Sequence, residues 1–305
     1  NLFKRNESIV KTEDSDMDLF ERIDQKHEIF SKMPHPYYAE NETVDGIDHK
    51  MQLEWSAKAE KANYNNEALR DCVRMFGGGA NLSVGEVKEA LKKHKREVYD
   101  ELYAIRECAN KDALAEFEKC EKQAAKITYS SGEAKAPIGC GIYPQNPMWW
   151  ICVPDFRTGK EIFEPNKEGL YRYAYYFDAD GRLIMVSHRI NVDGKDEFNY
   201  EFTVFHYNAN RTIMLMYTKL PNAGPKHILL KVSERWCDDS GFAKRFMYAN
   251  VYREFLPLRD EVCREYLIEY NKGGQHVTSI LLNATRLIVQ QYDFNLPEEK
   301  LRYLY

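Results

Sequence analysis

The second half of the chain alternates between two kinds of residue, and this alternation constrains the fold more than any other feature. In the stretch YRYAYYFDADGRLIMV (171–186), an aromatic residue occupies every second position from Tyr171 to Phe177. A period of two is typical of a β-strand, whose successive side chains point to opposite faces. The residues DADG follow, where Asp side chains accept hydrogen bonds from nearby amides and Gly181 adopts a positive φ at little cost. The stretch therefore predicts a hairpin with its return strand at 182–190.

Similar turns recur along the chain. YNAN begins at Tyr207, CDDSG at Cys237 and YNKGG at Tyr270, so the steps counted from Phe177 are 30, 30 and 33 residues. Further turn sequences, VDGKD, PNAGP and PLRD, lie between them. Because an isolated hairpin is only marginally stable in water, the hairpins must pair side by side. The spacing predicts an antiparallel meander built from a repeated two-stranded unit.

The two faces of this predicted sheet differ in composition. On the strand at 198–205, one face carries Phe198, Tyr200, Phe202 and Val204, and the other carries Asn199, Glu201, Thr203 and Phe205. The first face is strongly apolar and the second mixes polar residues with aromatics and methionines. A face open to solvent would be more polar. We therefore expect the mixed face to be partly covered by helices, with exposure to a partner as the alternative.

Helix-forming residues dominate the chain before residue 130. Apolar residues recur three or four positions apart at 16–33, 51–76 and 84–127, which predicts amphipathic helices. The third helix has the clearest start, because Ser83 and Glu86 fit a capping box.

If continuous, the third helix would be ~65 Å long, but ANKDA (109–113) offers a place to restart it. We expect an antiparallel helical hairpin or a three-helix unit. Its apolar stripe is interpreted as a core within the chain, and a coiled coil with a partner is the alternative.

The composition changes near residue 130, where SSGEAKAPIGCG (130–141) has the character of a linker. We predict two domains, a helical domain at 1–129 and an antiparallel β-sheet domain with hairpin repeats at 130–305. The fold class is α+β, with helices packed on the sheet.

One motif resembles a known family. YAYYFDADGRL is similar to the YD repeat of Rhs-type toxin shells, in which Tyr, a Tyr-Asp pair and Gly-Arg mark each hairpin. This chain has Phe177-Asp178 in place of Tyr-Asp, followed by Gly181-Arg182. The resemblance covers at most 170–283. It implies a style of hairpin, and it transfers neither a toxin shell nor any functional residue.

Composition excludes several classes of protein. The net charge is -5 and the pI about 6.0, so no basic excess indicates nucleic acid or anionic lipid as a partner. The seven cysteines are widely spaced without a Cys-x-x-Cys pair, which favours a reducing compartment over a disulfide framework or zinc site. No apolar run approaches the roughly 20 residues of a membrane span. We expect a cytoplasmic protein, with secretion or an envelope location as the alternative because the chain begins at Asn1.

Some short motifs carry weak chemical signals. GGGANLS (77–83) lacks the Gly-Lys-Ser/Thr of a phosphate loop and is interpreted as a turn between helices. DADG and DGKD lack the late glutamate of a calcium loop and are interpreted as turns. Cys140 in GCG is a candidate nucleophile only if a strand histidine lies beside it. The glutamates at 161, 164 and 168 are interpreted as a solvated loop.

The preferred function is non-enzymatic binding of another protein, in the manner of immunity or antitoxin proteins, through an aromatic sheet surface. No cofactor and no metal are expected. The predicted binding residues are Trp149, Trp150, Tyr173, Tyr175, Tyr200 and Tyr217. Two alternatives stay open. One is a hydrolase or transferase with a site between helices and sheet, using Cys140 or a carboxylate and a strand histidine. The other is an envelope protein that binds glycan through the tryptophans and tyrosines.

Overall fold

A computed structural model describes part of the 305-residue chain. The described residues are 18–32, 74, 83–130, 161–162, 173–192, 195–219, 227–239, 243–251, 263–271, 274–282 and 287–294. The predicted helix at 51–76 falls almost entirely outside these ranges, as do most of the linker at 130–141, Cys140 and both tryptophans of NPMWW.

The described strands form one antiparallel sheet of 11 strands, in the order β11-β10-β9-β8-β7-β6-β5-β4-β3-β1-β2. The bounds are β1 (Lys126–Ser130), β2 (Glu161–Ile162), β3 (Tyr173–Phe177), β4 (Leu183–Val192), β5 (Lys195–Asn208), β6 (Arg211–Lys219), β7 (His227–Cys237), β8 (Ala243–Asn250), β9 (Cys263–Asn271), β10 (Gly274–Leu282) and β11 (Leu287–Phe294). From β3 to β11, each strand pairs with the next one in sequence. The predicted meander and the α+β class are therefore confirmed, and each turn named above lies between two consecutive strands.

The first hairpin shows how its sequence makes the turn. The Asp178 carboxylate accepts hydrogen bonds from the backbone N–H groups of Asp180 at 3.0 Å and Arg182 at 2.8 Å. Gly181 has a φ of +78°, which costs little only in glycine. The Arg182 side chain also pairs with Asp178 at 3.0 Å, and these contacts lower the pKa of Asp178 even though burial opposes ionisation. Strands β3 and β4 consequently reverse at the predicted place.

The described helices are α1 (Leu19–Lys32), α4 (Val84–Cys108) and α5 (Ala113–Gln123). The capping box predicted at the start of α4 is present, since Ser83 and Glu86 bond reciprocally. The long stripe does break within ANKDA, because Asp112 caps α5 by accepting from the Ala115 N–H at 3.1 Å.

The predicted third helix extends too far: the helical region ends at Gln123 of α5 and not at residue 127. Residues 126–130 form β1, which pairs with β3, and Ile127 is 37% exposed instead of lying in a helical core. Backbone pairing with β3 satisfies these residues, and tertiary pairing of this kind overrides a short helical period.

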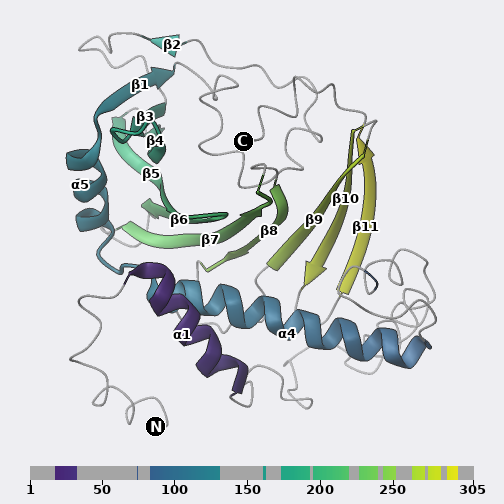
Figure 1. Ribbon diagram of the computed structural model, residues 1–305. Coiled ribbons are helices and arrows are strands. Elements are labelled where there is room, and N and C mark those ends of the chain that lie inside the picture. The colour runs from purple at the N-terminus through teal and green to yellow at the C-terminus, as the bar shows by residue number, and fades with distance from the viewer. Residues whose placement is uncertain are drawn as a thin grey trace, which may run out of the picture.

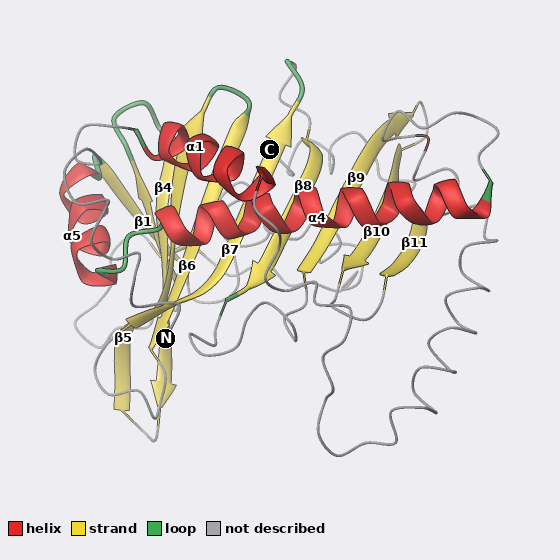
Figure 2. Cartoon of the chain, turned by 90° about the horizontal axis from the view of Figure 1, so that it is seen from below, coloured by secondary structure: helices red, strands yellow, loops and turns green. Residues whose placement is uncertain are grey.

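The sheet is strongly curved, so that β3–β5 and β9–β11 stand on opposite sides of β6–β8 (Figure 1). The helices pack on the convex face, where α4 runs across the strands with α1 beside it (Figure 2). The first core cluster lies between the helices and the sheet; it includes Leu102 and Ile105 of α4 with Phe202, Val204 and Leu215 of the strands.

The helices therefore cover the strongly apolar face of the sheet, and the expectation that they cover the mixed face is wrong. Apolar side chains on the first face match the apolar helix stripes, and burying both together gives the larger hydrophobic gain. The mixed face is the concave one. It holds a second buried cluster, which includes Tyr175, Phe205, Met214, Phe246 and Tyr266.

None of the described helices combines the length and the hydropathy that a membrane-spanning segment requires.

Candidate functional site

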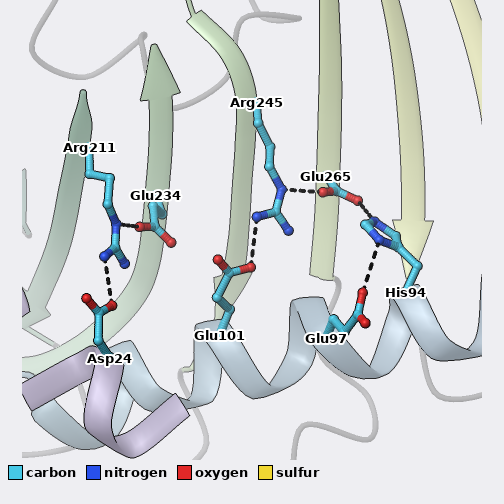
Figure 3. Close-up of polar contacts among 8 residues, drawn as sticks. All are labelled: Asp24, His94, Glu97, Glu101, Arg211, Glu234, Arg245 and Glu265. Atoms are coloured by element: carbon cyan, nitrogen blue, oxygen red, sulfur yellow. Dashed lines mark hydrogen bonds and ion pairs between the residues drawn. The ribbon is translucent and has the colours of Figure 1, made fainter. Parts of the chain in front are cut away.

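Charged side chains alternate in sign across four neighbouring strands on the convex face. Arg211 of β6, Glu234 of β7, Arg245 of β8 and Glu265 of β9 form this set, which we call the charge ladder (Figure 3). Their strand positions place them on the same face as Ile213 and Met247 of the helix-facing core. Both glutamates have 0% exposure. Ionised groups so deeply buried need partners close by.

Helix α4 supplies further partners at the β8–β9 end of the ladder. Arg245 donates to Glu265 at 2.5 Å and pairs with Glu101 of α4 at 2.8 Å. His94 Nε2 lies 2.5 Å from the second Glu265 oxygen, and His94 Nδ1 lies 3.9 Å from Glu97 (Figure 3). Burial alone would raise the pKa of Glu265, but Arg245 and His94 hold it below its ordinary value. Both carboxylate oxygens are thus engaged.

The β6–β7 end of the ladder is less completely paired. Arg211 donates to Glu234 at 2.6 Å and to Asp24 of α1 at 2.7 Å, while its guanidinium lies 4.5 Å from the centre of the Trp236 ring. The other Glu234 oxygen is buried and has no hydrogen-bond partner among the described residues. Burial and the nearby Glu101 raise the pKa of Glu234 to about 7, although Arg211 opposes this shift. The ladder ties α1 and α4 to the sheet and leaves Glu265 with no oxygen for a substrate.

A smaller polar group lies where α5 meets the sheet. His206 Nε2 of β5 is 3.7 Å from the buried Glu116 carboxylate, whose other oxygen accepts from Asn110 at 2.9 Å. Burial lowers the pKa of His206 to about 4, so the ring is neutral near pH 7. Burial also raises the pKa of the Cys120 thiol to about 12. A histidine with so low a pKa is a weak base, and a protonated thiol is a poor nucleophile.

The concave face brings ionisable side chains of three strands among aromatic rings. The His188 ring of β4 stacks on Tyr173 of β3, with ring centres 4.3 Å apart and planes at 4°. His188 Nδ1 lies 4.0 Å from the Glu201 carboxylate of β5, its partner in the strand register. Both of these side chains keep about one fifth of their surface exposed, at 22% and 21%.

Lys231 of β7 completes this group, which we call the concave cluster: Tyr173, His188, Glu201, Lys231 and Tyr248. The Lys231 ammonium lies 4.0 Å from the centre of the Tyr248 ring. Burial lowers the pKa of Lys231 to about 8 and raises that of Glu201 to about 7, and the attraction between the two groups opposes both shifts. Displaced pKa values of this kind gather at functional sites more often than elsewhere.

The structure distributes the predicted binding residues over both faces. Tyr173 and Tyr175 lie in the concave core at 6% and 0% exposure. Tyr217 faces the helices, is 1% exposed and donates to the Asn110 carbonyl at 3.0 Å. Tyr200 belongs to β5 but its side chain is not described, and Trp149 and Trp150 lie outside the described residues. The three described tyrosines thus do not make one exposed surface, because the two-residue period sends them to opposite buried faces.

Sequence reasoning missed the chemically most distinctive residues. The sequence did not single out five buried or partly buried ionisable residues, because charged residues normally lie in solvent. These residues are His94, Glu101, Glu234, Glu265 and Lys231. The available signal was a charge at a position whose neighbours two residues away are apolar, as for Glu234 beside Val232. Within the described residues, no group of His, Cys, Asp and Glu side chains is arranged to hold a metal ion.

Comparison of the chain with protein-family models, curated proteins and solved structures finds no match.

Proposed function

We propose that this chain is a non-enzymatic protein-binding protein whose contact surface includes the concave cluster. The observation that carries the proposal is the contrast between the two faces. On the convex face the side chains of the charge ladder contact their oppositely charged partners from the helices and strands at 2.5 to 2.8 Å. On the concave face His188 and Glu201 are 4.0 Å apart, and about one fifth of each side chain is exposed and can be contacted from outside the chain.

The composition of the concave cluster also favours recognition. The buried rings of Tyr173 and Tyr248 contact His188 and Lys231, and the exposed fifth of His188 and Glu201 offers polar groups to a partner. Protein partners of the immunity or antitoxin kind, such as a toxin domain, are the class that we propose.

Affinity capture from native lysate followed by mass spectrometry tests this function. We expect a stoichiometric partner with the unmodified chain and its loss with His188→Asn. The matched control is His27→Asn, the same change on α1 at the convex side, which should retain the partner. Failure to recover any stoichiometric partner, or equal recovery with both variants, would count against the proposal.

A second candidate is a hydrolase or transferase whose site lies between the helices and the sheet. The contact between His94 of α4 and the buried Glu265 favours it, because a carboxylate that orients a histidine is a common acid–base arrangement. Against it, Arg245 occupies the remaining Glu265 oxygen. Turnover of a chromogenic ester, phosphate or glycoside that disappears in Glu265→Gln would support this reading. The glycan-binding alternative depends on Trp149 and Trp150 and stays a prediction.

A further inference from the structure

Lys231 differs from Arg211 and Arg245, the two cations of the charge ladder. Arg211 and Arg245 each contact two carboxylates at 2.5 to 2.8 Å. Among the residues that the structure describes, no carboxylate lies within ion-pair distance of the Lys231 ammonium, and its close contact is the Tyr248 ring at 4.0 Å. Since a mostly buried ammonium is costly without an anion in direct contact, this position favours an anion supplied from outside the described residues.

The groups around Lys231 come from each neighbouring strand. Strand β8 contributes Tyr248, and strand β6 contributes the uncharged Met216 as the register partner of Lys231. Beyond β6 lie Glu201 of β5 and His188 of β4, which face the same side of the sheet. Glu201 is the carboxylate that interacts with Lys231, and it does so from beyond ion-pair contact. A small anion at this position would contact the Lys231 ammonium and the Tyr248 ring beside it.

We infer that the concave face contains a carboxylate-binding site centred on Lys231, with the Tyr248 ring as its aromatic wall. The inference deepens the proposed function, since the carboxylate would belong to an Asp, a Glu or the C-terminus of the partner protein. A carboxylate is favoured over a larger anion because one ammonium supplies one charge and the adjacent Tyr248 ring is flat.

Binding at this site is coupled to protons. The ligand stabilises the charged form of Lys231, so it raises the pKa of Lys231 above its starting value of about 8. An ionised Glu201 repels the ligand, and its pKa is about 7. The affinity for a carboxylate should thus be greatest below pH 7 and fall as the pH rises through 7 and 8, where Glu201 ionises and Lys231 loses its proton.

Sodium benzoate is the probe, because it joins a carboxylate to an aromatic ring, and benzamide is its uncharged control. The lysines are labelled by reductive ¹³C-methylation, and the Lys231 signal is assigned by its loss in Lys231→Arg. Benzoate should shift this signal and raise its apparent pKa by about one unit, whereas benzamide should not. The signals of Lys219 and Lys244 should stay unchanged. Equal effects of both probes, or no response of the Lys231 signal up to the solubility limit of benzoate, would overturn the inference.

Glu201→Gln provides a second measurement that does not remove Lys231. This variant should bind benzoate more tightly than the unmodified chain above pH 7 and equally well at pH 5, because the repelling charge is absent. An unchanged pH profile would contradict the proposed coupling. Benzoate binding without a captured protein partner would leave the carboxylate site standing and overturn only the protein-binding function. Capture of a partner by Lys231→Met as efficiently as by the unmodified chain would overturn the carboxylate site and leave the protein-binding function standing.

Discussion

Two buried glutamates on the same sheet face have opposite protonation behaviour. Glu265 accepts from Arg245 on one oxygen and contacts His94 with the other, and its pKa is lowered. Glu234 is equally buried, but within the described part of the chain one of its oxygens has no donor, so burial and the repulsion from Glu101 raise its pKa. The number of donors around a carboxylate, and not burial alone, decides whether it is charged.

Glu234→Gln should remove a pH-dependent loss of stability. The folded-state pKa of about 7 exceeds the unfolded value, so the stabilisation by protonated Glu234 is complete below the unfolded pKa and is lost as pH rises toward 7. Glutamine keeps the shape and cannot ionise. We expect urea unfolding to show a flatter dependence on pH between about 5 and 7 in the variant, with at least equal stability at about pH 8.

The opposite result would be a Glu234→Gln variant that loses more stability at high pH than at low pH. That would mean that the Glu234 carboxylate is ionised and held by Arg211.

Two turn residues offer a matched test of backbone strain. Gly181 has a φ of +78°, and Ala209, in the turn between β5 and β6, has a φ of +46°. A β-carbon added at Gly181 would meet no atom within 4 Å, so Gly181→Ala tests the backbone conformation alone. We expect Gly181→Ala to lower the free energy of unfolding by about 1 kcal/mol and Ala209→Gly to raise it by about 0.5 kcal/mol. Urea denaturation of both variants measures this, and a stabilising Gly181→Ala would refute it.

At the scale of elements, α4 is held to the sheet by both packing and charge. Val98, Leu102 and Ile105 of α4 are at most 1% exposed and form the core beneath the helix. His94 and Glu101 on the same helix reach Glu265 and Arg245. The apolar residues provide most of the attraction, and the charges restrict where along the strands the helix lies.

Glu265→Gln should be strongly destabilising, because it leaves Arg245 with one carboxylate instead of two and removes the charge facing His94. We expect a loss of about 3 kcal/mol at neutral pH, measured by chemical denaturation. The control is Glu97→Gln on α4, whose side chain is 52% exposed and 3.9 Å from His94. This control should cost no more than about 0.5 kcal/mol.

Acid should reduce the difference between Glu265→Gln and the unmodified chain. The depressed folded pKa of Glu265 means that its contribution is present above the unfolded pKa and disappears as the pH falls through the folded value. Equal losses at neutral and acidic pH would show that the missing contribution is one of shape and not of charge.

At the scale of the whole molecule, the curved sheet separates two cores. The convex core contains residues of α1, α4 and α5 together with those of the strands, so the helices share their apolar contacts with the sheet. The described residues of the concave core all belong to strands. The predicted division into domains at 1–129 and 130–305 stays a prediction. Strand β1 spans this boundary, and its residues Lys126–Ser130 pair with β3 of the sheet.

A shared core should make the described helices and strands unfold together. We expect one cooperative transition in urea, with coincident curves from far-ultraviolet circular dichroism, which reports mainly the helices, and from tyrosine and tryptophan fluorescence. Two separated transitions would instead indicate that the helical part and the sheet fold independently.

The amino-acid sequence by itself determined the structural features that depend on residues close together in the chain. Alternating residues specified β3 to β6, Asx and Gly residues specified where the chain reverses, and Ser83 with Glu86 specified the start of α4. These features need only contacts within a few positions, so they can be predicted from the order of residues. The identity of 126–130 as a strand could not, because it depends on pairing with β3, almost fifty residues away.

Only the tertiary structure decided which sheet face the helices cover and which charges meet. The charge ladder joins residues of α1 and α4 to residues of β6–β9, and the concave cluster joins β3, β4, β5, β7 and β8. Whether a buried Glu or Lys has a partner is a property of these long-range contacts, and the donor count around it sets its charge. Local sequence specifies the strands, whereas their curvature and packing determine which of their side chains can do chemistry.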